Sequence, residues 1–305
     1  MAVPPGLIVR KDKFGNDIWL GDGGEVIFAP VDCIPDYRKH LQHIRDMQLR
    51  ADDVLIVGYP KSGNNWLHHM VSMLIEGTTH LPPLFGDSNF PFLDICGAGR
   101  ELAAPDKGRA LMSHLAFRYL PRDVEDKRVK IIYLVRNPKD AMVSLYHHVG
   151  STLPPIRYEG SWDQFLTTVL EQGYWYGSIF EHRKEWQRTI EEHPDHPIFL
   201  VHYENLKKDT VKQLKELDTF LGTNRSTEFC QAVAATCILS NMENTRVLHN
   251  DVISRNTFCW NENRKFYRKG EVGDWKNYFT VAQNEKFDEV CGKKLADCGQ
   301  LFIFE

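Results

Sequence analysis

Short apolar runs, each followed by a polar or Gly/Pro turn and then a helix-like stretch, divide much of the chain. Three runs, at residues 54–57, 130–135 and 197–201, are continuous and rich in branched residues. Such runs are typical of strands that are buried on both faces of a parallel sheet. A shorter run at 109–113 predicts a fourth strand. The alternation with helices predicts an α/β fold, in which helices flank a central parallel sheet.

Polar side chains follow the carboxyl ends of these predicted strands. Lys61 lies in the turn after residue 57, Arg136 follows residue 135, and Tyr203 comes two residues after 201. His114 directly follows the fourth run. Ligands of open α/β sheets bind beyond the carboxyl ends of the strands. The pattern therefore predicts one polar rim to which four strands contribute.

The 305 residues suit one large α/β domain or two small ones, and one domain is the simpler prediction. In it, residues 1–50 form a lead-in to a core at 51–305. Residues 81–105 are rich in proline and glycine and predict a long loop, and loops of that length are usually functional.

Composition restricts the choice of partners. Hydrophobic residues make up 42% and charged residues 26% of the chain, as in ordinary globular proteins. The net charge is −4, from 37 basic and 41 acidic side chains. This balance argues against a nucleic-acid partner or an anionic membrane surface. Any anion site is therefore expected to be local.

The sequence also carries signals of location. Its start, MAVPPGLIVRKDKFGNDIW, has a short apolar stretch interrupted by Arg10 and Lys11, which is not typical of a signal peptide. No run approaches the ~18 apolar residues of a membrane span. The seven cysteines are scattered without a CxxC pair. We expect reduced, buried thiols in a cytoplasmic protein, and no zinc site.

The segment GYPKSGNNW, residues 58–66, joins a predicted strand to an amphipathic helix. Gly63 allows backbone amides to turn inward, the helix amino terminus favours an anion, and Lys61 adds a positive charge. It is not a Walker A loop, because the lysine precedes the glycine. From these residues alone, an ordinary turn with a surface lysine fits equally well.

Tyr59-Pro60-Lys61-Ser62-Gly63 followed by Trp66 resembles the 5′-phosphosulfate loop of the cytosolic sulfotransferases. Three more family signatures follow in order. YLVRNPKDAMVS at 133–144 resembles the 3′-phosphate segment, RKGEVGDW at 268–275 resembles the nucleotide clamp, and KNYFTVAQNE at 276–285 matches the KxxxTVxxxE dimer motif. The chain is identified as a member of this family. The resemblance implies a three-layer sandwich with a P-loop-like phosphate-binding loop.

The resemblance implies 3′-phosphoadenosine 5′-phosphosulfate (PAPS) as the donor and 3′-phosphoadenosine 5′-phosphate (PAP) as its product. Lys61 would be catalytic, because it stabilises charge on the bridging oxygen. Arg136 and Ser144 would hold the 3′-phosphate, and Tyr203 and Trp66 the adenine. Without the motifs, Arg136 would suit a surface ion pair and Tyr203 a core position. The implied nucleotide-binding residues are Lys61, Ser62, Gly63, Asn64, Asn65, Trp66, Arg136, Ser144, Tyr203, Thr236, Arg268, Lys269 and Gly270.

His114 resembles the base of the family, the histidine that follows a strand and takes the proton of the acceptor during in-line attack. The chain has 13 histidines, so position and not residue type singles it out. An imidazole with a pKa near ~6.5 suits base catalysis at neutral pH. No metal ion is expected, because lysine and backbone amides would neutralise the transferred group.

The acceptor is expected to be a hydroxyl or amine of a small lipophilic molecule. Phe90-Pro91-Phe92-Leu93 resembles the PFLE loop of the family, which makes Phe92 a candidate pocket wall. His148 stands where pocket linings are often phenylalanine, so the pocket is expected to be more polar. A loop core for Phe92 and a helix surface for His148 are equally open.

The chain departs from the family pattern in three places. Asn64 and Asn65 replace two threonines, and Met112 stands where the KTHL segment carries a lysine near the transferring group. The stretch at 236–242 resembles TSFxxMK but lacks its phenylalanine, so Ile238 or Leu239 would cover the adenine. These departures motivate an alternative, a nucleotide-binding family member with impaired catalysis.

A P-loop kinase is a third possibility, but it needs a Walker lysine that the sequence lacks. The dimer motif implies a homodimer that forms through Lys276, Thr280, Val281 and Glu285.

Overall fold

Within the described part of the chain, the central sheet has four parallel strands in the order β5-β4-β6-β7. They are β4 (Val54–Val57), β5 (Ala110–Ser113), β6 (Lys130–Val135) and β7 (Ile198–His202). The computed structural model describes residues 3–31, 34–80, 91–95, 108–238, 268–298 and 302–304. In the register, Val54 lies between Ala110 and Lys130. The predicted parallel sheet is confirmed, and so is the fourth strand.

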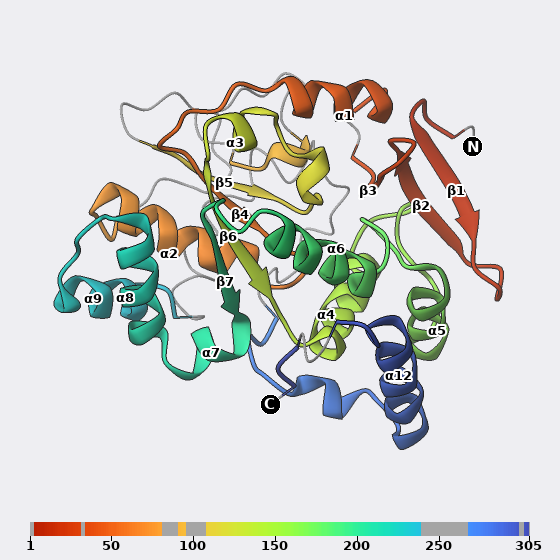
Figure 1. The fold of residues 1–305 in the computed structure, drawn as a ribbon. Helices are drawn as coiled ribbons and strands as arrows, with labels where there is room; N and C mark the ends of the chain where they lie inside the picture. Colours follow the sequence, from red (N-terminus) through yellow and green to blue (C-terminus); the bar gives the residue numbers. More distant parts are fainter. Residues whose placement is uncertain are drawn as a thin grey trace.

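Helices cover both faces of this sheet, so the predicted three-layer arrangement is confirmed (Figure 1). Ile56 packs into an apolar layer with α2 (Asn64–Glu76), α8 (Thr210–Leu221) and α9 (Thr227–Thr236). Its neighbours Leu55 and Val57 point to the other face, where α4 (Pro138–Gly150), α5 (Trp162–Gln172) and α6 (Ile179–Glu192) contribute to the core. Side chains of a strand alternate between faces, which explains this division.

One strand prediction was wrong in its burial. The run at 197–201 was expected to be buried on both faces, but β7 starts one residue later and ends the strand order. Ile198 and Phe199 are half-buried, and Leu200 is 37% exposed. A strand at the end of a sheet has a neighbour on one side alone, which leaves an apolar run partly open to solvent.

The first fifty residues hold a second sheet that the sequence pattern did not predict. β1 (Leu7–Lys11), β2 (Asp17–Asp22) and β3 (Ile27–Phe28) pair antiparallel, and α1 (Tyr37–Asp46) follows. Tyr37 is fully buried, and its hydroxyl accepts a hydrogen bond from Val31 N–H at 2.6 Å. Tyr37, Phe28 of β3 and Ile18 of β2 share one apolar cluster with Leu55. The segment is therefore packed against the central layers and is more than a lead-in.

The remaining elements are short or lie late in the chain. Helix ends follow ordinary capping rules: Asn137 caps α4 with Pro138 at its first position, and Gly77 ends α2 in the left-handed conformation. The other helices of the described residues are α3 (Asp123–Asp126), α7 (Tyr203–Lys208) and α12 (Val281–Lys294), with 3-10 helices at Leu93–Ile95, Phe117–Tyr119 and Asp274–Asn277.

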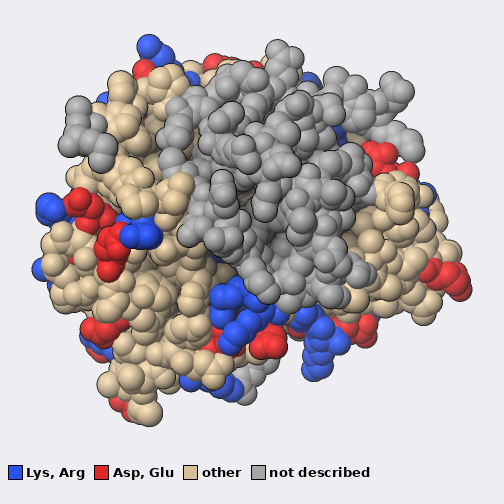
Figure 2. All heavy atoms as spheres, turned by 180° about the vertical axis from the view of Figure 1, so that it is seen from behind, with Lys and Arg blue, Asp and Glu red and all other residues tan. Residues whose placement is uncertain are grey.

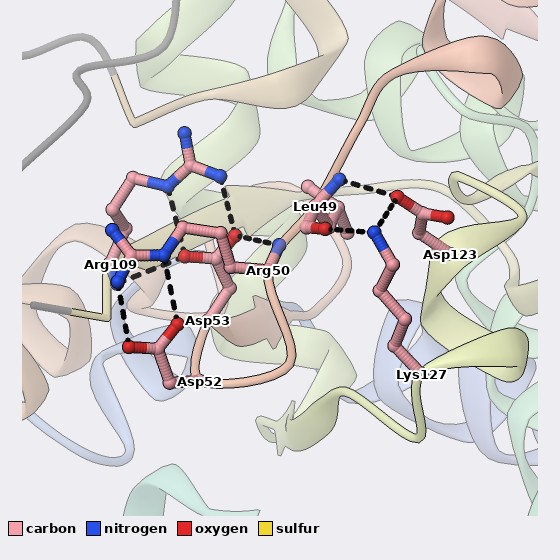
Figure 3. A network of polar contacts seen from close by, with 7 residues as sticks. All are labelled: Leu49, Arg50, Asp52, Asp53, Arg109, Asp123 and Lys127. Atoms are coloured by element: carbon pink, nitrogen blue, oxygen red, sulfur yellow. Dashed lines mark hydrogen bonds and ion pairs between the residues drawn. The ribbon is translucent and has the colours of Figure 1, made fainter.

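A polar network ties the amino ends of β4 and β5 (Figure 3). Asp53 is 1% exposed and accepts hydrogen bonds from Arg109 Nε at 2.9 Å and from the backbone N–H of Arg50 at 2.8 Å. Burial raises the pKa of Asp53, but these hydrogen bonds outweigh it, so the pKa lies below 3.8. The charged pair fixes the amino ends of two neighbouring strands, on the side away from the predicted rim.

Candidate active site

The phosphate-binding loop joins β4 to α2 through a tight turn. Lys61 and Gly63 both have positive φ, 69° and 109°, and Ser62 N–H donates to Tyr59 O at 3.1 Å. Gly63 is the amino-terminal cap of α2 and has no side chain to satisfy the first amides of the helix. A Cβ at Gly63 would lie 2.9 Å from the Tyr203 ring. The loop therefore presents backbone N–H groups at a 13-residue helix, as an anion site requires.

Arg136 connects three of the sequence motifs. Its Nη1 donates to Lys61 O at 2.9 Å, and its Nη2 donates to Glu271 O at 3.3 Å. The guanidinium lies 4.4 Å from the centre of the Tyr203 ring. Arg136 is 8% exposed, and its Nε has no partner within the described part of the chain. Segments far apart in the sequence thus meet at one buried cation.

The residues predicted for the adenine also lie together. Trp66 packs edge-on against Tyr203 with ring centres 5.5 Å apart, and its Nε1 donates to Cys237 O at 2.8 Å. Thr236, the last residue of α9, donates from its hydroxyl to Ala232 O at 2.9 Å. Ile238 is 52% exposed. Leu239, the other candidate cover for the base, lies outside the described residues.

The predicted clamp is organised by one buried carboxylate, Asp274, which is 4% exposed. Arg268 and Lys269 pair with it at 2.5 and 2.6 Å. Burial opposes its ionisation, but hydrogen bonds from Lys269, Asn277 and Arg268 lower the pKa of Asp274 to about 2. Two cations share one anion, so the pair of basic residues keeps a net positive charge.

The clamp is also anchored to α4, the helix that follows Arg136. Asp140 accepts hydrogen bonds from the backbone N–H groups of Gly273 at 2.8 Å and Trp275 at 2.9 Å. Ser144 lies one turn further along the same helix and is half-buried. Gly270 has φ 66°. Asp140 was not among the predicted site residues, although it lies inside the motif at 133–144.

His114 directly follows β5, and its Nδ1 lies 2.6 Å from Gly58 O. A carbonyl oxygen only accepts, so Nδ1 carries the proton and Nε2 keeps its lone pair. Burial is the main reason that the pKa of His114 is lowered to about 4; the charge of Lys61 lowers it too, and the Gly58 bond opposes both. The imidazole is therefore neutral at pH 7, with Nε2 as its basic nitrogen.

The two predicted acceptor residues lie beside the two predicted catalytic ones. Phe92 packs edge-on against His114 with ring centres 4.9 Å apart. Lys61 Nζ lies 3.1 Å from His148 Nδ1, and because lysine only donates, Nδ1 of His148 accepts. The His148 ring packs in turn against Trp175, 5.7 Å between ring centres. Neither residue is confined to a separate core or an open helix surface.

Two of the three departures from the family pattern, at Met112 and at Asn64-Asn65, have different surroundings. Met112 is 1% exposed and packs with Ile56 and Leu67 in the apolar layer under α2, so it supplies no polar group there. Asn64 is 6% exposed, and its Nδ2 donates to Gly58 O at 3.1 Å, the carbonyl that His114 also uses. Asn65 is half-buried in the first turn of α2.

Asp94 and Tyr176 contact His114, and the sequence pattern gave no reason to select them. Asp94 accepts the backbone N–H of His114 at 2.9 Å, and the Tyr176 ring lies edge-on to the imidazole at 5.0 Å. The one available signal was the place of Asp94 next to the Phe92-Leu93 segment.

The predicted dimer residues lie at the surface around the start of α12. Lys276, Thr280 and Glu285 are exposed, and Val281 is 75% exposed. Thr280 also caps α12, because its Oγ1 accepts Gln283 N–H at 3.2 Å.

The face in Figure 2 mixes acidic and basic side chains, apart from one group of Lys and Arg side chains near its lower centre. None of the described helices is long and apolar enough to cross a membrane. In the described ranges, no three His, Cys, Asp or Glu side chains are grouped as metal ligands.

The fold and site define a nucleotide-binding α/β protein with a strand–loop–helix anion site, and comparison with known proteins gives its family. Residues 51–299 match the model of the sulfotransferase domain. Rat sulfotransferase 1A1 is 34% identical over 288 residues, covering 90% of this chain and 95% of the relative. Dog sulfotransferase 1B1 is 31% identical over 302 residues, covering 95% and 97%. The chain belongs to the sulfotransferase family and is a PAPS-dependent sulfotransferase.

Solved structures agree with this assignment. Mouse sulfotransferase SULT7A1 complexed with PAP has a TM-score of 0.67 at 28% identity, covering 95% of this chain and 96% of that one. Retinol dehydratase in a complex with retinol and PAP has a TM-score of 0.74 at 19% identity, covering 97% and 92%, which shows the shared fold.

Proposed function

We propose that this sulfotransferase transfers the sulfuryl group of PAPS to a hydroxyl or amine of a small lipophilic acceptor, with His114 as the base. The observation that carries the proposal is the 2.6 Å contact between His114 Nδ1 and Gly58 O. This contact orients the neutral imidazole of His114 against the loop that also bears Lys61. A base has to be unprotonated and within hydrogen-bond reach of the proton it removes.

The residues present fit the donor. No room exists for a side chain at Gly63, the first amides of α2 face the turn, and the buried Arg136 keeps an unpartnered Nε within the described residues. PAPS supplies the sulfuryl group and leaves as PAP. Its phosphosulfate would be held by Lys61, Ser62, Gly63, Asn64, Asn65 and Trp66. Its 3′-phosphate would be held by Arg136, Ser144, Arg268, Lys269 and Gly270. Its base would be held by Tyr203, Trp66 and Thr236, with Ile238 or Leu239 as the cover.

The proton then has a defined destination. His114 Nε2 accepts it from the acceptor hydroxyl or amine as the acceptor oxygen or nitrogen bonds to sulfur, while the bond from sulfur to the bridging oxygen breaks. Lys61 provides positive charge for that oxygen. Phe92 and His148 would form two walls around the acceptor, one apolar and one polar.

The test is transfer of labelled sulfate from PAPS to a panel of phenols, alcohols, steroids and amines. His114→Ala should lower the rate by about 10²–10⁴-fold, the usual contribution of a general base. Stabilisation of the protein by PAP should persist in this variant. His43→Ala, at an exposed histidine of α1, is the matched control and should match the wild type. Full activity of His114→Ala would refute the assignment.

A second candidate is a family member that binds the nucleotide but catalyses poorly. The buried, apolar surroundings of Met112 favour it, because no cation occupies the position that the family gives to lysine. It predicts stabilisation by PAP together with no sulfated product across the whole panel.

We also propose a homodimer through Lys276, Thr280, Val281 and Glu285, supported by the 75% exposure of Val281. Val281→Glu should give a monomer in light scattering, because a two-fold contact suffers each change twice. Lys293→Glu on the same helix is the control. A wild type that is monomeric at micromolar concentration would contradict the proposal.

A cytoplasmic location is proposed as well, and free thiols at Cys230, Cys237, Cys291 and Cys298 support a reducing compartment. Cell fractionation tests it.

A further inference from the structure

Asp94 lies in the 3-10 helix Leu93–Ile95, and its carboxylate is fully buried. It sits beside the end of β5, the strand that directly precedes the proposed base. Its Oδ1 accepts a hydrogen bond from Ser113 Oγ at 2.6 Å, and its Oδ2 accepts the backbone N–H of His114 at 2.9 Å. The Tyr176 hydroxyl faces this carboxylate and lowers its pKa. One side chain therefore joins the end of β5 to the turn that holds Tyr176.

Tyr176 is held in an unusual backbone conformation. Its φ is 61°, which residues other than glycine rarely adopt. Its backbone N–H donates to Ile27 O at 2.6 Å, and its ring lies 5.0 Å from that of His114. Such conformations persist where the surroundings hold them, and they cluster at functional sites. The Asp94 carboxylate is one of the groups that hold the ring beside the imidazole.

The backbone around Asp94 is anchored without its side chain. Met112 N–H donates to Pro91 O at 2.7 Å, and His40 Nε2 lies 2.6 Å from Asp94 O. Replacing the carboxylate therefore leaves the segment attached to β5 and α1.

The side chain itself meets neutral donors. The titratable groups that face Asp94 in the described structure are His40 from α1, His114 after β5 and Tyr176, together with the Ser113 hydroxyl. No lysine or arginine of the described residues is paired with it. Burial raises the pKa of Asp94 to about 6, although its hydrogen bonds oppose the rise.

We propose that the Asp94 carboxylate is a positioning residue, which sets the place of His114 and of the Tyr176 ring for proton transfer from the acceptor. The proposal rests on the proposed role of His114 as the base. It assigns to Asp94 no contact with donor or acceptor.

The first test is Asp94→Asn, with 4-nitrophenol as the acceptor probe and PAPS at saturation. An amide has one accepting oxygen, so it cannot serve both Ser113 and the His114 amide, and its NH₂ would face a donor. We expect kcat to fall about 10²-fold, as a small misplacement of reacting groups does. The affinity for PAP should stay within about twofold, because the phosphate loop does not contact Asp94.

The pH profile separates positioning from general damage. Wild-type kcat should fall as the pH drops through about 6, because a protonated Asp94 accepts fewer hydrogen bonds, whereas His114 stays neutral down to about 4. Asp94→Asn should lose this acidic limb. The donor phosphate also titrates near ~6, but it does so in both proteins. An unchanged kcat and pH profile, or loss of PAP binding, would overturn the proposal.

Hydrogen exchange and a Tyr176 variant test the same proposal without relying on the activity of Asp94→Asn. In the nucleotide-free protein, hydrogen exchange at the His114 amide should accelerate about tenfold or more in Asp94→Asn, while α2 stays protected. This arm decides the proposal even if 4-nitrophenol is not an acceptor. If Asp94→Asn does not fold, Tyr176→Phe removes the hydroxyl that faces Asp94 and keeps the ring beside His114. It should lower kcat by about 3–10-fold, as loss of one polar positioning contact does, and leave PAP binding intact. An unchanged kcat refutes the proposal. A fully active His114→Ala would refute the base instead.

Discussion

A buried carboxylate lies near each end of the β4–β5 pair, and the pKa values of the two carboxylates are shifted in opposite directions. At the amino ends of β4 and β5, Asp53 is paired with the Arg109 guanidinium and its pKa is lowered. At the carboxyl end of β5, Asp94 meets hydroxyl and N–H donors and its pKa is raised to about 6. Both are at most 1% exposed, so burial alone does not separate them.

The difference matches the proposed division of tasks, in which the amino ends of the strands serve stability and their carboxyl ends hold the proposed base. A carboxylate beside a guanidinium keeps its charge and locks the two strands, at the edge where no ligand is expected. Asp94 meets neutral donors, so its charge brings no further lysine or arginine of the described residues to the rim. The cations there are Lys61 and those predicted to bind the nucleotide. Substitutions at the amino end should therefore affect mainly stability, whereas those at the carboxyl end should affect activity as well as the pH dependence of stability.

The largest effect is expected at the amino end. Asp53→Asn leaves the Arg109 guanidinium partly buried without its counter-charge, which should lower the free energy of unfolding by about 3–5 kcal/mol. Activity per folded molecule should not change. Denaturant unfolding measures the loss, with Asp52→Asn as the matched control, because Asp52 pairs with Arg50 at the surface. A variant that keeps its stability but loses activity would reverse the comparison.

The next effect concerns the pH dependence of stability. Asp94 binds its proton more tightly in the folded chain, because its pKa rises from 3.8 to about 6. Its contribution is therefore largest below pH 3.8 and declines by about 3 kcal/mol as the pH rises to 6. Asp53 acts in the opposite sense, since its lowered pKa contributes stability that is lost as the pH falls.

Asp94→Asn should accordingly flatten the stability profile between about pH 4 and 6, which urea titrations at several pH values would measure. An unchanged slope would mean that burial does not raise the pKa of Asp94.

A smaller effect is expected at the phosphate loop. Gly63→Ala places a side chain at φ 109° and 2.9 Å from Tyr203, a strain of about 1–3 kcal/mol. The affinity for PAP should fall with it, as measured by calorimetry. Gly108→Ala is the counterpart at the amino end, where a Cβ would clash with the backbone oxygen of Asp52. It should lower stability without changing the affinity of the folded protein for PAP; equal losses of affinity would remove the distinction.

The central sheet was predictable because its strands can be recognised from the local sequence. Val54–Val57 and Lys130–Val135 are continuous apolar runs, and both were found at the predicted residues. The turn after β4 was predictable from Gly63 and Lys61. The small antiparallel sheet was not, because β3 has two residues and β1 ends in charged positions that carry no clear period of two.

The sequence by itself determined the family and the donor, because each motif between Tyr59 and Glu285 is a short continuous run that can be recognised without the fold. It did not select Asp94, Tyr176 or Asp140, since each acts through contacts with residues from about 20 to 135 positions away in sequence. Only the tertiary structure decided that β7 ends the sheet, that Met112 faces an apolar layer and that His148 meets Lys61. Burial, charge pairing and hydrogen bonding between distant segments set those features, and local pattern does not encode them.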